Sequence, residues 1–328
     1  MYIRSMEWTD YWEAFITKKK LHSKVKAMDE MDVALGGKPQ TEEICRLIHE
    51  DYNKNYKGYL ETVRDEFLKE LDKFSSVHLQ SNRIKKIDSL LEKIITKRYS
   101  TLKDSKSGYA NISVDNYKEI VTDLIGMRII INYRGNWTLI HEEIVARFPF
   151  DIKLFENGQA STLPHLEDGQ PRLAQIPVAN YAAGDEKSGY EAKNLHTKLH
   201  KKNYRSIHYI VSYQKVYIEI QVRTIYDEAW SDCDHSYVYK HDENKSHTSL
   251  ERLSGVLCKI TNLANDMGDN MKVIYDSRPI IDAGSGKWIT DAGNKHVLEE
   301  QLRRLAEAKE DFQKFIDSIS VIMGGGEE

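Results

Sequence analysis

The stretch NYRSIHYIVSYQKVYIEIQVRT, Asn203 to Thr224, decides how this sequence is interpreted. Its second half alternates apolar and polar residues, as a β-strand with one buried face does. One face carries Val216, Ile218, Ile220 and Val222, and the other carries Tyr217, Glu219, Gln221 and Arg223. The first half repeats the pattern, with Tyr204, Ser206 and His208 on one side. Two neighbouring strands that each present polar and charged groups predict a sheet with a functional face.

The composition is typical of a globular protein with a sizeable core. Of the 328 residues, 40% are hydrophobic and 30% are charged, which excludes a disordered chain. No apolar run is long enough to span a membrane, and the polar N-terminus lacks a signal-peptide pattern. The cysteines Cys45, Cys233 and Cys258 form no CxxC pair, which argues against a disulfide framework or zinc site. We therefore expect a cytoplasmic protein. Its net charge of −4 means that nucleic-acid binding would need a local basic patch.

The periodicity around this strand pair predicts an α+β fold, in which helices flank a mixed β-sheet. Apolar residues at three- and four-residue spacing predict helices from Thr41 to about Phe74 and from about Ile84 to Arg98. Further elements are expected as a short helix before a buried strand at Met127–Tyr133, a helix over 136–148, a strand over 150–155 and helices over 226–240 and 249–271. Residues 156–203 are expected to form a long loop that ends in the basic tract KNLHTKLHKKN.

Basic residues gather at the start of the second predicted helix. Arg83, Lys85 and Lys86 open it, and Lys93 lies two turns further on. Cations at a helix start oppose the helix dipole, so a bound phosphate would explain their presence. A solvated basic face is the alternative.

Two carboxylates accompany the predicted strands. Asp123 stands just before the buried strand that carries Arg128, and Glu219 lies on the polar face of its own strand. A buried arginine needs a partner, so an Asp123–Arg128 ion pair is one interpretation. The other is that Asp123 and Glu219 supply oxygen ligands to Mg²⁺, whose shell phosphates would complete. For His208, a hydrogen-bonded core histidine is likewise the ordinary explanation.

Taken in order, these clusters resemble the synthetase domain of the RelA/SpoT family of alarmone synthetases, the enzymes of the stringent response. The likeness covers about Ile48 to Asp276. RIK, followed by Ser89 and Lys93, resembles the family's ATP-binding motif, and DLIGMRI its magnesium-binding strand entry. YRSIH is similar to the acceptor loop, EIQVRT to a family strand, and WSDCDHSYVYK to the closing helix of small synthetases. The sequence departs from the family at Asn203, where glycine is usual, and in its longer preceding insertion.

The resemblance implies a GTP/GDP diphosphokinase that transfers pyrophosphate from ATP to a ribose 3′-hydroxyl and releases AMP. Asp123 and Glu219 would be the catalytic residues and would hold Mg²⁺. The implied ATP-binding residues are Arg83, Lys85, Ser89, Lys93 and Arg128. The implied acceptor-binding residues are Tyr204, Arg205, Ser206, His208 and Gln221.

Three functions stay open from the sequence. The first is synthesis of (p)ppGpp from GDP or GTP, and the second is a toxin that pyrophosphorylates the 3′ end of tRNA. The third is an inactive nucleotide-binding regulator. We expect an N-terminal extension over 1–47, a synthetase domain over 48–276, and a C-terminal linker and helix over 277–328. The terminal segments are candidates for homo-oligomer, antitoxin or regulatory contacts.

Overall fold

A computed structural model describes residues 7–102, 108–149, 171–200, 204–239, 248–276, 280–281, 288–289, 303, 306, 310, 313 and 317. Its centre is a mixed sheet of strand order β1-β2-β7-β6-β4-β5, and β3 also pairs with β6. The strands are β1 Leu79–Ile84, β2 Ile125–Ile131, β3 Arg172–Leu173, β4 Val178–Tyr181, β5 His196–Leu199, β6 Ser206–Tyr213 and β7 Val216–Thr224. A separate pair joins β8 Ile280–Ile281 to β9 Trp288–Ile289. The α+β prediction is confirmed.

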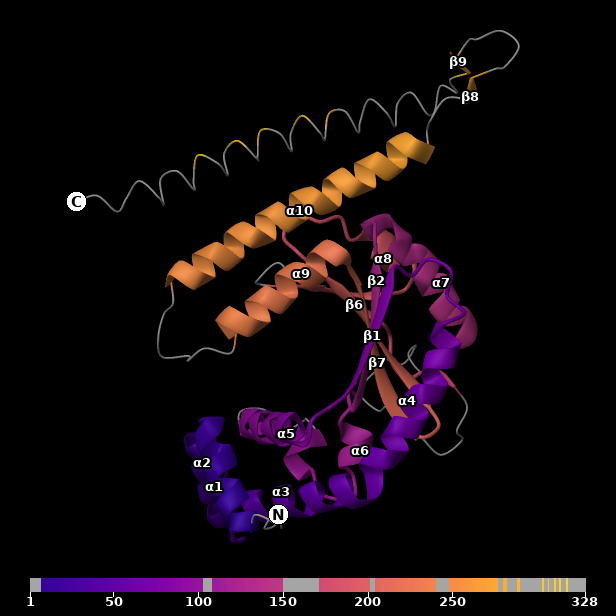
Figure 1. The fold of residues 1–328 in the computed structure, drawn as a ribbon. Coiled ribbons are helices and arrows are strands. Elements are labelled where there is room, and N and C mark those ends of the chain that lie inside the picture. Colours follow the sequence, from indigo (N-terminus) through magenta and orange to yellow (C-terminus); the bar gives the residue numbers. More distant parts are fainter. Residues whose placement is uncertain are drawn as a thin grey trace, which may run out of the picture.

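Helices cover both sides of the sheet, with α4 and α7 on one side and α9 and α10 on the other (Figure 1). The α-helices are α1 Trp8–Lys18, α2 His22–Ala34, α3 Thr41–Asp51, α4 Lys57–Leu71, α5 Ile87–Thr101, α6 Tyr117–Ile120, α7 Trp137–Arg147, α8 Ser188–Ala192, α9 Ile225–Asp234 and α10 Thr248–Asp276. A π-helical turn, Tyr52–Tyr56, joins α3 to α4, so the helix predicted from Thr41 forms with this irregularity inside it. None of the described helices is long and apolar enough to cross a membrane.

The two faces of the sheet differ in chemistry. On the face toward α4 and α7, Met127, Ile129 and Tyr209 are almost fully buried, and the Tyr209 hydroxyl lies 3.2 Å from Nδ1 of His141 on α7. Strands β6 and β7 pair antiparallel, with His208 opposite Gln221. Because neighbours in register point the same way, the polar residues of both strands share the opposite face.

The first predicted basic cluster folds differently from the expectation. Residues Leu79–Ile84 form an edge strand, and Arg83 pairs in register with Gly126 of β2. Arg83 therefore does not open a helix, and α5 begins only at Ile87. Every β1 side chain is exposed or half-buried, so this strand has no buried face to produce an alternating pattern.

The prediction of a long loop over 156–203 is wrong for residues 171–200, the main part of this segment that the structure describes. Residues 171–200 contain β3, β4, α8 and β5, and β5 forms the other edge of the sheet. Strand β5 is largely exposed and β4 is only four residues long, so neither leaves a clear periodic signal. The strand expected over 150–155, the remainder of the loop and most of the expected C-terminal helix lie outside the described residues.

The N-terminal helices hold α5 from one side. The Tyr11 hydroxyl donates to Asp88 at 2.8 Å, and Lys19 forms a 2.5 Å ion pair with Glu92. Near the other end of α5, Arg98 pairs with Asp32 at 2.8 Å. The buried residues of α1 and α2 join the same hydrophobic cluster as those of the sheet. The helical N-terminal extension is thus observed, while the expected boundary at residue 47 stays a prediction.

Candidate active site

The polar face of the sheet brings together residues from four strands. In the parallel β2–β7 pair, Gly126 lies opposite Glu219 and Arg128 opposite Gln221. Arg83 lies opposite Gly126, and a Cβ on that glycine would lie 3.4 Å from Arg83 Nε, an ordinary van der Waals distance. The Arg83 side chain therefore lies over Gly126 on this face of the sheet. The predicted ATP-side and acceptor-side residues on these strands therefore share one surface.

At the α5 end of this face, two lysines hold one carboxylate. Asp123 Oδ2 lies 2.8 Å from Lys85 Nζ, and Asp123 Oδ1 lies 2.8 Å from Lys93 Nζ. The three side chains are 14%, 10% and 25% exposed, respectively. The Tyr52 hydroxyl of the π-helical turn donates to the Lys85 carbonyl at 2.5 Å, which fixes the backbone beside this cluster. The cluster carries a net positive charge and is partly open, as an anion-binding site requires.

The ionisation of this cluster follows from burial and charge. Burial acts to raise the pKa of Asp123, but the Lys93 and Lys85 ammonium groups outweigh it and lower that pKa. Burial lowers the pKa of Lys85 more than the Asp123 charge raises it. At Lys93 burial also acts to lower the pKa, but Asp123, Tyr109 and Glu219 together raise it. Asp123 is thus a carboxylate that faces two ammonium groups.

Glu219 has a different environment, made of a histidine and an amide. His208 Nδ1 lies 3.3 Å from Glu219 Oε1, and Gln221 Nε2 donates to Oε2 at 2.7 Å. Burial and the charge of Asp123 act to raise the pKa of Glu219, but His208 and Gln221 lower it overall. Glu219 lies opposite Gly126, three positions after Asp123, so both carboxylates lie near the start of the β2–β7 pair. His208 is therefore a partner of the predicted catalytic carboxylate.

Arg223 holds Tyr204, one of the residues predicted to bind the acceptor. The Arg223 guanidinium carbon lies 4.9 Å from the Tyr204 ring centre, and Nη2 donates to the Tyr204 hydroxyl at 2.5 Å. That hydroxyl also lies 3.0 Å from His208 Nε2. Arg223 is 6% exposed and donates in addition to Gln221, and Ser206 Oγ lies 3.3 Å from its Nε. Sequence reasoning placed Arg223 on the polar face but gave it no role.

Arg128 and Asp123 do not pair, so the structural alternative for these two residues is wrong. Arg128 Nη1 instead donates to Glu228 Oε1 at 2.5 Å and lies 3.4 Å from Asp232 Oδ1. Both partners are on α9, about a hundred positions along the chain, and sequence reasoning missed them. Acidic residues in a first helical turn ordinarily complement the helix dipole, so Glu228 gave no separate signal.

The family model for the region found in RelA/SpoT proteins matches residues 82–244. This interval contains the lysine-bound Asp123, the polar sheet face and Glu228. Residues 82–244 belong to the RelA/SpoT family.

The solved structures that are similar to this chain include a GTP pyrophosphokinase family protein and two small alarmone synthetases. A GTP pyrophosphokinase family protein from Streptococcus pneumoniae is 17% identical, with 72% of this chain and 92% of that chain covered and a TM-score of 0.38. Small alarmone synthetase 1 from Bacillus subtilis, bound to its product pppGpp, is 16% identical over 81% and 97% of the two chains, with a TM-score of 0.37. Small alarmone synthetase 2 from Bacillus subtilis is 17% identical over 69% and 98%, with a TM-score of 0.40. No curated protein matches the sequence.

Within the RelA/SpoT region, Arg205 lies apart from the other predicted acceptor residues. Its Nε and Nη2 donate to the two Asp185 oxygens at 2.6 and 2.8 Å, and Nη1 donates to Asn262 on α10. Its acceptor-binding role stays a prediction, because in this structure its guanidinium ties α10 to the β4–α8 connection. Ser89 lies one helical turn before Lys93 and therefore on the same side of α5.

The donor set of the RelA/SpoT region fits Mg²⁺ that is shared with a polyphosphate. Among the described residues, no cluster of three or more His, Cys, Asp and Glu side chains could hold a metal by itself. Mg²⁺ in nucleotide sites typically uses one or two carboxylates, with phosphates and water completing its shell. Asp123 and Glu219 match this smaller requirement.

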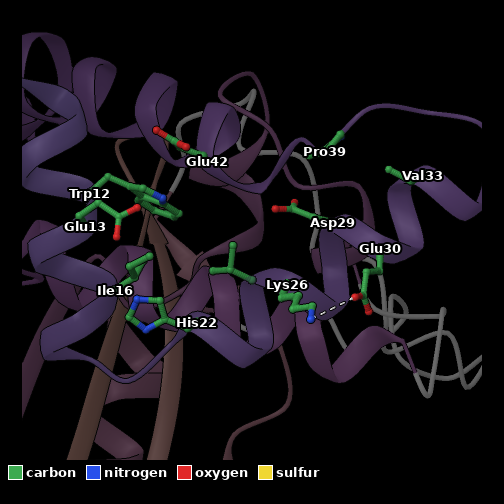
Figure 2. Close-up of a pocket in the computed structure, with 11 residues that line it drawn as sticks. Trp12, Glu13, Ile16, His22, Lys26, Asp29, Glu30, Val33, Pro39 and Glu42 are labelled. Atoms are coloured by element: carbon green, nitrogen blue, oxygen red, sulfur yellow. Dashed lines mark ion pairs between the residues drawn. The ribbon is translucent and has the colours of Figure 1, made fainter.

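A hollow of about 570 Å³ lies outside the RelA/SpoT region, between α1, α2 and the start of α3. Figure 2 shows Trp12, Glu13 and Ile16 together on one side of the view and the Lys26–Glu30 ion pair on the other. None of the predicted site residues lines it. The expected regulatory contact of the N-terminal segment stays a prediction.

Proposed function

We propose that this protein is an ATP-dependent pyrophosphokinase that transfers the β,γ-pyrophosphate of ATP to the ribose 3′-hydroxyl of GDP or GTP. The observation that carries the proposal is the polar sheet face, where a carboxylate held by two lysines and a carboxylate held by a histidine and an amide both lie near the start of the β2–β7 pair. This arrangement separates a polyphosphate-binding end from an acceptor end within the RelA/SpoT region. The three free cysteines are consistent with a reducing cytoplasm.

The lysine end would bind ATP. Lys85 and Lys93 neutralise the polyphosphate, and the planar guanidinium groups of Arg83 and Arg128 flank the adenine. Asp123 and Glu219 would hold Mg²⁺, which when bound neutralises charge on the transferred phosphates. Lys85 and Lys93 both contact Asp123 in this structure. When ATP binds, the two lysines would therefore leave the Asp123 carboxylate and contact the phosphates instead.

Glu219 would orient the acceptor. The 3′-hydroxyl oxygen attacks the β-phosphorus, the bond from that phosphorus to the α,β-bridging oxygen breaks, and AMP leaves with that oxygen. The hydroxyl proton passes to Glu219 and then to solvent. The lowered pKa makes Glu219 a weak base, so its main role would be to orient the hydroxyl, and the proton would be transferred late. Phosphoryl-type transfer depends mainly on positioning and electrostatics, which this role supplies. Tyr204 would stack on the acceptor base.

One observation favours the tRNA alternative. The edge strand β5 presents exposed His196 and Lys198, and His200 beyond it lies 5.2 Å from the Tyr204 ring. An exposed basic edge that leads to the acceptor end suits an extended phosphate backbone. Lys193 of the same tract is paired with Glu142 at 2.8 Å, and Lys201 and Lys202 lie outside the described residues.

Radiolabel transfer tests the proposal directly. The protein is incubated with ATP labelled in the γ-phosphate and with GDP, GTP or deacylated tRNA. We expect label on GDP or GTP together with AMP release, and no label on the matched 3′-deoxy nucleotide. Label on tRNA alone would establish the toxin activity. Nucleotide binding without AMP release would establish the inactive regulator and refute the proposal.

A further inference from the structure

Glu228 occupies an unusual place between the two halves of the site. Its Oε1 accepts from Arg128 Nη1 at 2.5 Å, and its Oε2 accepts from Arg223 Nη1 at 2.9 Å. Arg128 belongs to the proposed ATP end, and Arg223 holds Tyr204 at the proposed acceptor end. One carboxylate thus joins two arginines that serve different nucleotides.

The first turn of α9 fixes the position of Glu228. Thr224 caps the helix, because its side chain accepts from the Asp227 backbone N–H at 3.1 Å. The Asp227 carboxylate accepts from Thr224 Oγ1 at 2.7 Å and from Asn265 of α10 at 3.1 Å. Asp227 is 6% exposed and Asn265 is 1% exposed. Glu228 therefore extends from a backbone that β7 and α10 anchor, and a side chain on such a backbone can hold a precise geometry.

Guanidinium geometry determines what this contact does. A carboxylate binds the N–H edge of a guanidinium and leaves its flat faces free to stack on rings. The structure shows this at Arg223, whose edge donates to Glu228 and to Ser231 while its carbon lies over the Tyr204 ring. The same edge contact at Arg128 leaves a guanidinium face available for a base.

The positions of Arg128 and Arg223 depend on the charge of Glu228, which pairs with both. Arg223 is buried and Arg128 is 29% exposed, and Glu228 itself is 17% exposed. Asp232 is the other carboxylate on Arg128, but it lies 3.4 Å away and is 63% exposed. Without Glu228, the two guanidinium groups would repel each other and would lose the carboxylate to which both donate.

We propose that Glu228 is a positioning residue that aligns the ATP-side Arg128 and, through Arg223, the acceptor-side Tyr204. This inference rests on the proposed function. Under this proposal Glu228 affects the affinity for both nucleotides through the two arginines, without contacting either nucleotide itself.

Calorimetry measures the two affinities separately, using GDP and an ATP analogue with a methylene group in place of the α,β-bridging oxygen. Glu228→Asp keeps the charge but shortens the side chain, so it cannot reach both arginines. We expect the Kd of both ligands to rise about five- to tenfold, or ~1–1.4 kcal/mol in binding free energy for each ligand. Tyr204→Ala should weaken GDP alone, and Arg83→Ala the analogue alone. An unchanged Kd for either ligand in Glu228→Asp would overturn the proposal.

Matched variants on α9 separate positioning from stability. Asp234→Ala removes the contact in which Asp234, at the C-terminal end of α9, accepts from Ser254 Oγ of α10 at 2.7 Å, away from the turn that positions Glu228, so it should lower the melting temperature and leave both Kd values unchanged. If Asp234→Ala weakens both ligands as much as Glu228→Asp, helix stability explains the effect and the proposal fails. Asp232→Asn should change only the analogue, by less than twofold. A wild-type protein that binds neither ligand would instead refute the proposed function.

Discussion

The ion pairs of Asp123 with Lys85 and Lys93 make Asp123→Asn an informative variant. At 2.8 Å, each pair has a Coulomb attraction of about 6 kcal/mol at an effective dielectric constant of 20, most of which desolvation offsets. The neutral amide leaves two ammonium groups without a counter-charge. Removing one member of a buried pair costs about 3–5 kcal/mol, and the 25% exposure of Lys93 favours the lower end. We therefore expect the melting temperature to fall by roughly 6–10 °C.

In this variant ATP binding without Mg²⁺ should become tighter, whereas turnover with Mg²⁺ should fall. Without Mg²⁺, ATP no longer competes with Asp123 for the two lysines, so its Kd in EDTA should fall about fivefold, or ~1 kcal/mol. Turnover with Mg²⁺ should fall about a hundredfold or more, because the variant lacks a metal-binding charge worth about 3 kcal/mol.

Calorimetry in EDTA, thermal unfolding and AMP release at saturating Mg²⁺ measure the three effects. Asp51→Asn is the matched control, because Asp51 pairs with Lys118 at 2.8 Å outside the polar face. It should lower the melting temperature and leave turnover unchanged. Near-normal turnover of Asp123→Asn would refute the metal role, and weaker ATP binding in EDTA would refute the competition between phosphate and carboxylate.

Three further predictions concern Glu219 and Tyr204. Glu219→Gln should lower kcat about a hundredfold while its melting temperature falls less than that of Asp123→Asn, since Glu219 contacts one imidazole and one amide rather than two ammonium groups; a large loss of stability would make Glu219 structural. Tyr204→Ala should raise the acceptor KM about tenfold with little change in the ATP KM, and Tyr204→Phe should be mild; an unchanged acceptor KM would exclude stacking. The folded-state pKa values of Asp123 and Glu219 are lowered, so their stabilisation is complete above the unfolded-state values near pH 4–4.5 and is lost as pH falls through the folded-state values. Unfolding titrations between pH 5 and 3 should accordingly show a shallower loss of stability in Glu219→Gln than in wild type, and equal slopes would contradict the lowered pKa of Glu219.

The sequence by itself determined the central strands and much of the polar face. Residues Val216 to Val222 alternate because one side of β7 is buried, and that periodicity is local. The same pattern in β6 placed His208 and Ser206 on one side, as the pairing of β6 with β7 confirms. The long helices were readable for the same reason, since each has an apolar stripe against the core.

Only the tertiary structure decided which charges meet. Arg128 pairs with Glu228, 100 positions away, because β2 lies parallel to β7 and α9 begins directly after β7. Asp123 meets Lys85 and Lys93 because β1 lies beside β2 and delivers α5 to the start of that strand. The edge strands β1 and β5 were invisible in the sequence, since strands with largely exposed side chains carry no hydrophobic period. Periodicity reports how each segment faces the core, whereas ion pairs depend on which segments become neighbours, and a single segment does not encode its neighbours.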